Sequence, residues 1–224
     1  MDSIFKGDLA SKAGRRNAWL DSLFVDHAIL RTFWSNFAPV DPGILYRGNH
    51  PTPQRLRDYV RQHGIKTVIN LRGRTHSGSD ALSREAAADL GLDFVDMALE
   101  SRGAPQRERI LRLAEIYRTM RAPALIHCKS GADRAGLAAA LYVLIKRGSS
   151  QDAFAQLSRR FGHIRESNTG ILDRFIETYA REAEGKTEFL DWVAHSYDET
   201  RLRQDFSSKS WFARLINDKF LARE

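Results

Sequence analysis

Residues 127–134 read HCKSGADR, and the interpretation of the whole chain starts from this stretch. It holds the one cysteine of the 224 residues, Cys128, six positions before Arg134. Residues 122–127 end in a short apolar run that predicts a buried strand. Residues 135–145 are apolar and rich in alanine, which predicts a buried helix. The segment is therefore predicted to fold as a strand, a tight loop and a helix.

Such a loop turns its backbone N–H groups inward at the N-terminus of a helix, and this makes a cradle for an anion. A cysteine at the mouth of the cradle is expected to have a lowered pKa and to be a thiolate near neutral pH. Arg134 closes the loop with a guanidinium that suits two phosphate oxygens at once. These parts are what hydrolysis of a phosphate monoester through a phosphocysteine requires. The alternative is a structural cysteine before a helix, with Arg134 at the surface.

HCKSGADR resembles the C-x5-R signature loop of the cysteine-dependent protein tyrosine phosphatase superfamily. The similarity is to its dual-specificity-like branch, to its lipid- or inositol-directed branches and to small bacterial tyrosine phosphatases. It covers roughly residues 40–182, where YRGNHP (46–51) and VINLRG (68–73) are similar to the first two strands of the dual-specificity branch. The resemblance implies a cysteine nucleophile without metal or cofactor, and a phosphate site formed by Lys129, Ser130, Gly131, Ala132, Asp133 and Arg134.

The resemblance also implies a general acid that protonates the leaving oxygen. Relatives usually carry an aspartate in the loop that here spans residues 100–105, but this loop holds none, so Glu100 is its candidate. Asp133 is an equal candidate, because C-x4-D-R resembles phosphatases in which the aspartate of the loop has been assigned this role. Its alternative role is to order the loop or to pair with Arg72 or Lys129. Asp96, which falls inside a strand pattern, is a third candidate.

Residues around the loop bear on how the site is supported, how highly charged its substrate is and how fast it turns over. His127 is expected to support the loop, and Arg72 and Arg102 are expected at its rim. Lys129 adds charge there, which favours a highly charged substrate unless the side chain is simply solvated. Ala135 departs from the resemblance, since relatives usually have a serine or threonine here, whose hydroxyl helps phosphocysteine to break down. The departure affects the expected turnover rate and not the expected fold.

The net charge of +7 is unevenly distributed. Residues 185–224 are neutral, with seven basic and seven acidic residues, so the excess lies in residues 1–184. A positive field focused on a cleft suits an anionic substrate. A nucleic-acid partner is not expected, because no basic helix with interleaved aromatic residues is seen. The cations presumed to lie near strand ends are Arg47, Arg72, Arg74, Arg102, Lys129 and Arg165.

One cysteine excludes an internal disulfide and fits a reducing compartment. The first residues lack an apolar leader segment, and the longest apolar run is too short to span a bilayer. A cytoplasmic protein is therefore expected, with a peripheral contact at the inner membrane face left open. The helix predicted over residues 211–221 carries Trp211 and Phe212, and Phe189 and Trp192 precede it. These aromatic residues are expected either to pack on the domain or to contact a membrane or a partner.

Alternating strand and helix patterns up to the signature loop predict an α/β fold with a central mixed, largely parallel sheet flanked by helices. One amphipathic helix, or two, over residues 16–37 and a C-terminal helical segment add to it. Strands are predicted at residues 43–46, 66–71 and 92–97 and before the loop, and a helix at residues 152–161. We expect residues 1–38 to form an N-terminal extension, residues 39–184 the phosphatase domain that the resemblance implies, and residues 185–224 a C-terminal extension.

The function predicted is hydrolysis of phosphate monoesters through a phosphocysteine, of the protein tyrosine or dual-specificity type. The first alternative is a phosphatase acting on a phosphorylated lipid or inositol head group. The second is a catalytically weak phosphate-binding module, to which Ala135 points. Thiol chemistry such as sulfur transfer or arsenate reduction is a third, but a six-position loop closed by arginine matches phosphate better.

Overall fold

The structure, a computed structural model, describes residues 4–26 and 34–207. Its centre is a five-stranded sheet in the order β1-β2-β5-β3-β4. β1 pairs antiparallel with β2, and the other three pairings are parallel, which confirms the predicted mixed, largely parallel sheet. The strands are β1 (Ala38–Asp41), β2 (Leu45–Asn49), β3 (Thr67–Asn70), β4 (Asp93–Asp96) and β5 (Ala124–Cys128).

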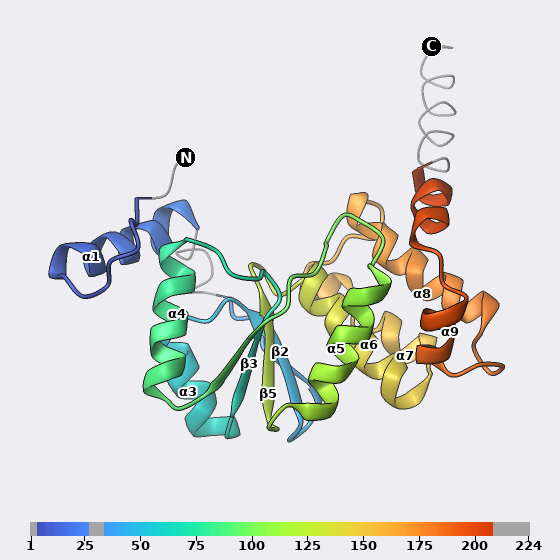
Figure 1. Cartoon of the computed structure of the whole chain (residues 1–224), viewed down its shortest axis with the longest axis horizontal. Helices are drawn as coiled ribbons and strands as arrows, with labels where there is room; N and C mark the ends of the chain where they lie inside the picture. The colour runs from blue at the N-terminus through green and yellow to red at the C-terminus, as the bar shows by residue number, and fades with distance from the viewer. Residues whose placement is uncertain (1–3, 27–33, 208–224) are drawn as a thin grey trace, which may run out of the picture.

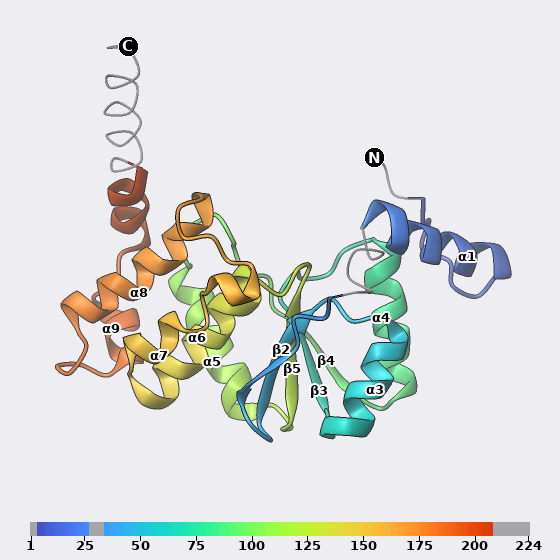
Figure 2. The same cartoon turned by 180° about the vertical axis from the view of Figure 1, so that it is seen from behind.

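Helices cover both faces of the sheet (Figures 1 and 2). On one face lie α3 (Pro53–His63) and α4 (Gly78–Asp89), and beyond α4 lie α1 (Lys12–Leu20) and a short π-helix, η1 (Asp21–Val25). The other face carries the remaining α-helices. These are α5 (Arg107–Thr119), α6 (Asp133–Arg147), α7 (Ser150–Phe154), α8 (Ile171–Glu182) and α9 (Phe189–His195), with two short 3-10 helices, η2 (Arg159–Phe161) and η3 (Asn168–Gly170).

The central strands are buried on both faces because their side chains alternate between two cores. Val68 and Leu125 point to one side and pack with Leu56 of α3. Ile69 and Ile126 point to the other side and belong to the larger core with α5, α6 and α8. This double burial explains why β3 and β5 read as continuous apolar runs in the sequence.

Two predicted elements differ from the structure. Of the one or two helices predicted over residues 16–37, the structure shows α1 and η1 as far as Val25, residues 27–33 lie outside the described residues, and residues 34–37 are not helical. Residues 38–41 form the strand β1, which was not predicted. Pro39 lies in β1, and a proline is tolerated there because β1 is an edge strand of the sheet. The predicted helix over residues 152–161 ends early, because α7 stops at Phe154 and only η2 follows.

The N-terminal segment is docked on α4. Asp21 Oδ2 accepts a hydrogen bond of 2.7 Å from the backbone N–H of Gly78 at the start of α4. A side chain at position 78 would meet the backbone oxygen of Ala18 at 2.1 Å, so glycine allows α1 to approach this closely. Phe5, Ala18 and Leu82 form a small separate core between the two elements.

The C-terminal segment also packs on the domain. Phe189 and Trp192 of α9 are buried and contact Phe175 and Tyr179 of α8. The expectation that these two residues pack on the domain is confirmed, whereas the aromatic residues predicted over 211–221 lie outside the described residues. Within residues 4–26 and 34–207, no helix has the length and apolar character needed to cross a membrane.

Candidate active site

The topology gathers three chain segments at one edge of the sheet. The backbone N–H of Leu71 donates to the carbonyl of His127 at 2.9 Å, and the N–H of Leu99 donates to the carbonyl of Leu71 at 3.2 Å. The residues that follow these positions are Cys128, Arg72 and Glu100. All three therefore leave the carboxyl ends of β5, β3 and β4 side by side, where parallel sheets place their ligand sites.

Cys128 is the last residue of β5 and is buried. Its Sγ accepts a hydrogen bond from the backbone N–H of Gly131, with N and Sγ 3.2 Å apart. Gly131 has a φ of +78°, and a Cβ there would lie 2.8 Å from the carbonyl carbon of Gly48 and from the backbone nitrogen of Asn49. Glycine is therefore needed at position 131 both for the turn and for the close approach to β2.

The carbonyl groups of the loop are held from outside. Arg47 Nη2 donates to the carbonyl oxygens of Gly131 and Ala132 at 2.8 and 3.2 Å. Asn36 Nδ2 donates to the carbonyl oxygen of Ser130 at 3.1 Å. Carbonyls tied to the protein in this way leave the N–H groups of the loop for its inner side, which is the arrangement of an anion cradle.

Arg47 corrects the expectation of a cation at a loop position near a strand end. It belongs to β2 and is fully buried, with its guanidinium 3.8 Å from the centre of the Phe161 ring and 2.6 Å from the carbonyl oxygen of Gln156. Burial lowers the pKa of Arg47 to about 10, and the charge of Cys128 opposes that shift. A buried cation thus lies beneath the loop. Of the other cations presumed to lie near strand ends, Arg165 is exposed and paired with Glu177.

The start of α6 is open to an anion. Ala132 occupies its N-cap position without a side-chain hydrogen bond, unlike Thr52 and Ser77, whose hydroxyls cap α3 and α4. Uncapped N–H groups at a helix start are natural donors to phosphate. Arg134 in this first turn is half-buried, and within the described ranges its guanidinium has no hydrogen-bond or ion-pair partner.

Asp133 is bound to a histidine that the sequence did not single out. Asp133 Oδ1 lies 2.8 Å from His163 Nδ1, and His163 Nε2 lies 2.7 Å from Asp173 Oδ2. The imidazole is 1% exposed. Burial alone would lower the pKa of His163, but the two carboxylates outweigh it and raise this pKa to about 9. An imidazolium between two carboxylates therefore joins the loop to α8. The alternative role given to Asp133 was to order the loop or to pair with Arg72 or Lys129, and the structure pairs it with His163.

The other two candidate acids are also ion-paired. Glu100 Oε1 lies 2.5 Å from Arg109 Nη1, and its Oε2 is buried without a hydrogen-bond partner among the described residues. Asp96 Oδ1 accepts hydrogen bonds from Arg84 Nη2 at 2.7 Å and from Asn70 Nδ2 at 3.1 Å. Asp96 is thereby held within the strand layer, which favours a structural role.

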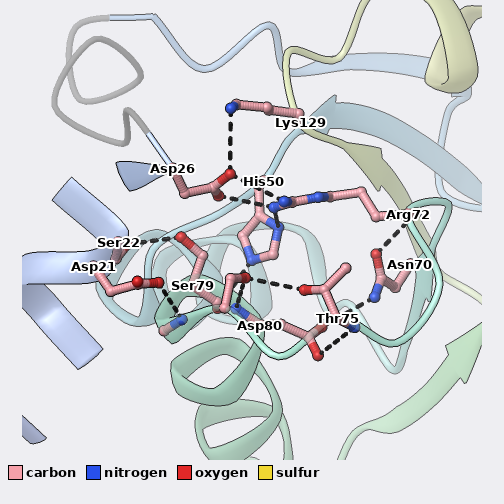
Figure 3. A network of polar contacts seen from close by, with 12 residues as sticks. Asp21, Ser22, Asp26, His50, Asn70, Arg72, Thr75, Ser79, Asp80 and Lys129 are labelled. Carbon is pink, nitrogen blue, oxygen red and sulfur yellow. Dashed lines mark hydrogen bonds and ion pairs between the residues drawn. The ribbon is translucent and has the colours of Figure 1, made fainter. Parts of the chain in front are cut away.

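The remaining predicted residues occupy different places. His127 is buried, and its ring meets the His50 ring edge-on at 4.7 Å between centroids. Arg102 is exposed in the loop after β4 and has no hydrogen-bond or ion-pair partner among the described residues. Arg72 and Lys129 both contact Asp26 of the N-terminal segment, as Figure 3 shows.

Asp26, His163 and the supporting role of Arg47 were missed in the sequence. His163 is 30 positions from Asp133 and Asp26 is 46 positions from Arg72, so no local pattern connects them. Arg47 lies inside YRGNHP, a stretch that was recognised, but its burial depends on how β2 packs against the loop.

The family model described as "DSP-PTPase phosphatase fused to NAD+ Kinase" matches residues 36–172. The chain belongs to this family. It is a cysteine-dependent phosphatase of the dual-specificity-like kind, and the match includes the whole loop around Cys128. No curated protein matches the chain.

Two solved structures show the same fold. The Siw14 catalytic core has a TM-score of 0.53 with 15% sequence identity, over 79% of this chain and 92% of that chain. TpbA from P. aeruginosa has a TM-score of 0.50 with 21% identity, over 77% of this chain and 91% of that chain. The phosphatase thus shares its architecture with proteins of low sequence identity to it.

Proposed function

We propose that this phosphatase hydrolyses phosphate monoesters through a phosphocysteine formed on Cys128. The observation that carries the proposal is the loop itself. Its carbonyls are bound by Arg47 and Asn36, its helix start is uncapped, and Arg134 has no partner among the described residues. A phosphoryl group bound there would meet inward N–H groups and one guanidinium, which stabilise its charge during transfer.

The reaction has two steps. The Sγ of Cys128 attacks phosphorus, the bond from phosphorus to the leaving oxygen breaks, and that oxygen takes a proton. Water then attacks phosphocysteine, the sulfur–phosphorus bond breaks, and inorganic phosphate leaves while the thiolate is restored. The N–H groups of residues 129–134 and the guanidinium of Arg134 hold the three equatorial oxygens throughout.

Asp133 and Glu100 are the two proposed proton donors. Asp133 lies in the loop beside Arg134 and has an imidazolium behind it. Glu100 follows β4 at the same end of the sheet and has one buried oxygen without a hydrogen-bond partner among the described residues.

Loss of the acid slows the hydrolysis of substrates with poor leaving groups most. Asp133→Asn and Glu100→Gln should therefore be compared on phenyl phosphate and para-nitrophenyl phosphate. The true acid is the residue whose variant loses about tenfold more activity on phenyl phosphate than on para-nitrophenyl phosphate.

Two classes of substrate fit this chemistry. A phosphotyrosine or other phosphorylated side chain in a protein is the first. A phosphorylated lipid or inositol head group is the second, and the cations of Arg72 and Lys129 beside the loop favour it because such groups carry several negative charges. Initial rates on phosphopeptides and on vesicles containing phosphorylated inositol lipids separate the two classes.

The test of the mechanism is hydrolysis of para-nitrophenyl phosphate by the wild type and by Cys128→Ser, with EDTA present. We expect turnover that survives EDTA and falls by more than about a thousandfold in the variant. Phosphate binding without turnover by a folded wild type would contradict the proposal and favour the phosphate-binding module. A catalytic thiolate must stay reduced, so we also propose a reducing compartment such as the cytoplasm.

A further inference from the structure

Asp26 places a carboxylate between two cations beside the catalytic loop (Figure 3). Arg72 binds it with both terminal nitrogens, Nη1 to Oδ2 at 2.8 Å and Nη2 to Oδ1 at 3.0 Å. Lys129 Nζ lies 3.4 Å from Oδ1. The side chain of Asp26 is 6% exposed and that of Arg72 is 13% exposed. Two-point geometry and burial hold the carboxylate in one orientation, unlike an exposed ion pair between two flexible side chains.

Both cations are part of the phosphatase domain, whereas the anion is not. Arg72 follows β3 at the same edge of the sheet as Cys128, and Lys129 is the residue after Cys128 in the loop. Asp26 lies outside residues 36–172, the part that matches the phosphatase family. The carboxylate therefore enters the mouth of the domain from an added segment.

Arg72 is held in place from behind without Asp26. His50 Nδ1 lies 3.3 Å from Arg72 Nη1, and His50 Nε2 lies 3.1 Å from the carbonyl oxygen of Ser79. The guanidinium would therefore stay near its position if the carboxylate withdrew, so the Arg72 part of the anion site is preformed.

The added segment likewise has anchors of its own. Asp21 accepts the N–H of Gly78, and Ser22 Oγ lies 2.8 Å from Ser79 Oγ. Displacement of Asp26 would thus leave these contacts to hold the segment on α4.

A phosphate suits this site better than a carboxylate does. Arg72 and Lys129 offer one planar fork and one ammonium group, and the carboxylate of Asp26 contacts both. A phosphate group brings up to two charges and three acceptor oxygens, which match a guanidinium fork and a second cation. A tethered carboxylate competes at a high effective concentration, so an incoming group must bind both cations to displace it.

We propose that Arg72 and Lys129 form a second phosphate site next to the catalytic loop, that Asp26 occupies it in the free enzyme, and that substrates with two neighbouring phosphate groups displace Asp26. This inference rests on the proposed function and narrows its substrate class. A monophosphate fills only the loop and gains nothing from the second site. A diphosphate or a vicinal bisphosphate binds to both sites and gains affinity from the second one. Competition from the Asp26 carboxylate determines how large that gain in affinity is.

The test measures binding of inorganic phosphate and inorganic pyrophosphate to the full chain by calorimetry, in the Cys128→Ser background so that nothing turns over. Asp26→Asn keeps the size of the side chain and removes its charge. We expect it to tighten pyrophosphate binding about tenfold more than phosphate binding. Adding Arg72→Met to Asp26→Asn should abolish this preference, and adding Lys129→Met should weaken it.

Asp93→Asn is the matched control, because Asp93 forms a similar two-point pair with Arg121, at 2.5 and 2.9 Å, at the opposite end of the sheet. It should leave both affinities unchanged. Equal tightening of phosphate and pyrophosphate by Asp26→Asn would overturn the inference, since Asp26 would then only shield the loop. No tightening of either ligand would overturn it as well.

The kinetic arm uses an inositol monophosphate and a vicinal inositol bisphosphate with active enzyme. We expect Asp26→Asn to lower the KM of the bisphosphate about tenfold relative to that of the monophosphate. Pyrophosphate is an anhydride, whereas the bisphosphate carries two phosphate esters that lie further apart. Comparing the two ligands shows which distance between phosphate groups fits the loop and the second site. If the wild type hydrolyses no monoester, the proposed function fails, but the binding comparison still decides whether the second site exists.

Discussion

Gly131 sets the shape of the loop at the scale of a single residue. Gly131→Ala should destabilise the protein by about 1–3 kcal/mol and lower kcat/KM more than a hundredfold, because the added Cβ is strained at this φ and meets Gly48 and Asn49. Gly43→Ala is the control, since Gly43 has a φ of +79° but no heavy atom within 4 Å of its Cβ position. Gly43→Ala should lower the stability through the same backbone strain but should leave kcat/KM unchanged. Urea denaturation and para-nitrophenyl phosphate kinetics check both, and equal losses of activity would contradict the role given to the loop.

Ala135 is the residue whose identity bears on turnover. It is fully buried in α6 directly after Arg134, so the chain offers no hydroxyl at that position. If breakdown of phosphocysteine limits the rate, Ala135→Ser should raise kcat about three- to tenfold and shrink any pre-steady-state burst, because its hydroxyl stabilises the departing thiolate. The buried hydroxyl should cost about 1–2 kcal/mol of stability.

Ala138→Ser is the control for that variant, because Ala138 is equally buried one turn further along α6. It should show a similar stability cost without the change in burst. An unchanged burst in Ala135→Ser would mean that another step limits turnover.

At the scale of the element, the loop is fastened to α8 through His163. The pKa of His163 in the folded protein is about 9, above the ordinary value of 6.5, so the folded state binds more protons between these two values. The contribution of His163 to stability is therefore complete below about pH 6.5 and is lost as the pH rises through 9. The loss should be on the order of 3 kcal/mol.

Urea denaturation of the wild type from pH 6 to 10 checks this prediction. His163→Gln should be less stable at pH 6 and should lack most of the decline with rising pH. A variant that keeps the full decline would show that other groups cause it. The same experiment with Asp173→Asn should give a smaller decline than the wild type, because one of the two carboxylates that raise the pKa of His163 is gone.

The whole molecule depends on packing that reaches beyond the family match. Phe189 and Trp192 of α9 complete an aromatic cluster with Phe175 and Tyr179, and this cluster belongs to the same core as the central sheet. Trp192→Ala should destabilise the protein by about 3–5 kcal/mol, because it opens a cavity in that core.

Trp19→Ala is the matched control for that substitution. Trp19 lies in α1 and is 37% exposed, against 2% for Trp192. It should cost less than about 1 kcal/mol in the same urea titration. Equal costs for the two tryptophans would show that α9 adds little to the stability of the domain.

The sequence by itself determined the class of the fold and the place of the loop, because both follow from local patterns. Apolar runs of strand length alternated with helical periodicity, and Cys128, Gly131 and Arg134 stood at the spacing of a loop between a strand and a helix. Predicted element boundaries were wrong where a residue type is compatible with two structures. Pro39, for example, suits both the end of a helix and an edge strand.

The partners of the site residues were decided only by the tertiary structure. Arg47 is 84 positions from Gly131, Asp26 is 46 from Arg72, and His163 is 30 from Asp133. Side chains this far apart meet only when the sheet order and the docking of helices bring their elements together. The sequence shows the charge of each residue. Burial and the partner of the residue decide its pKa and its ion pairs, and both depend on how the whole chain folds.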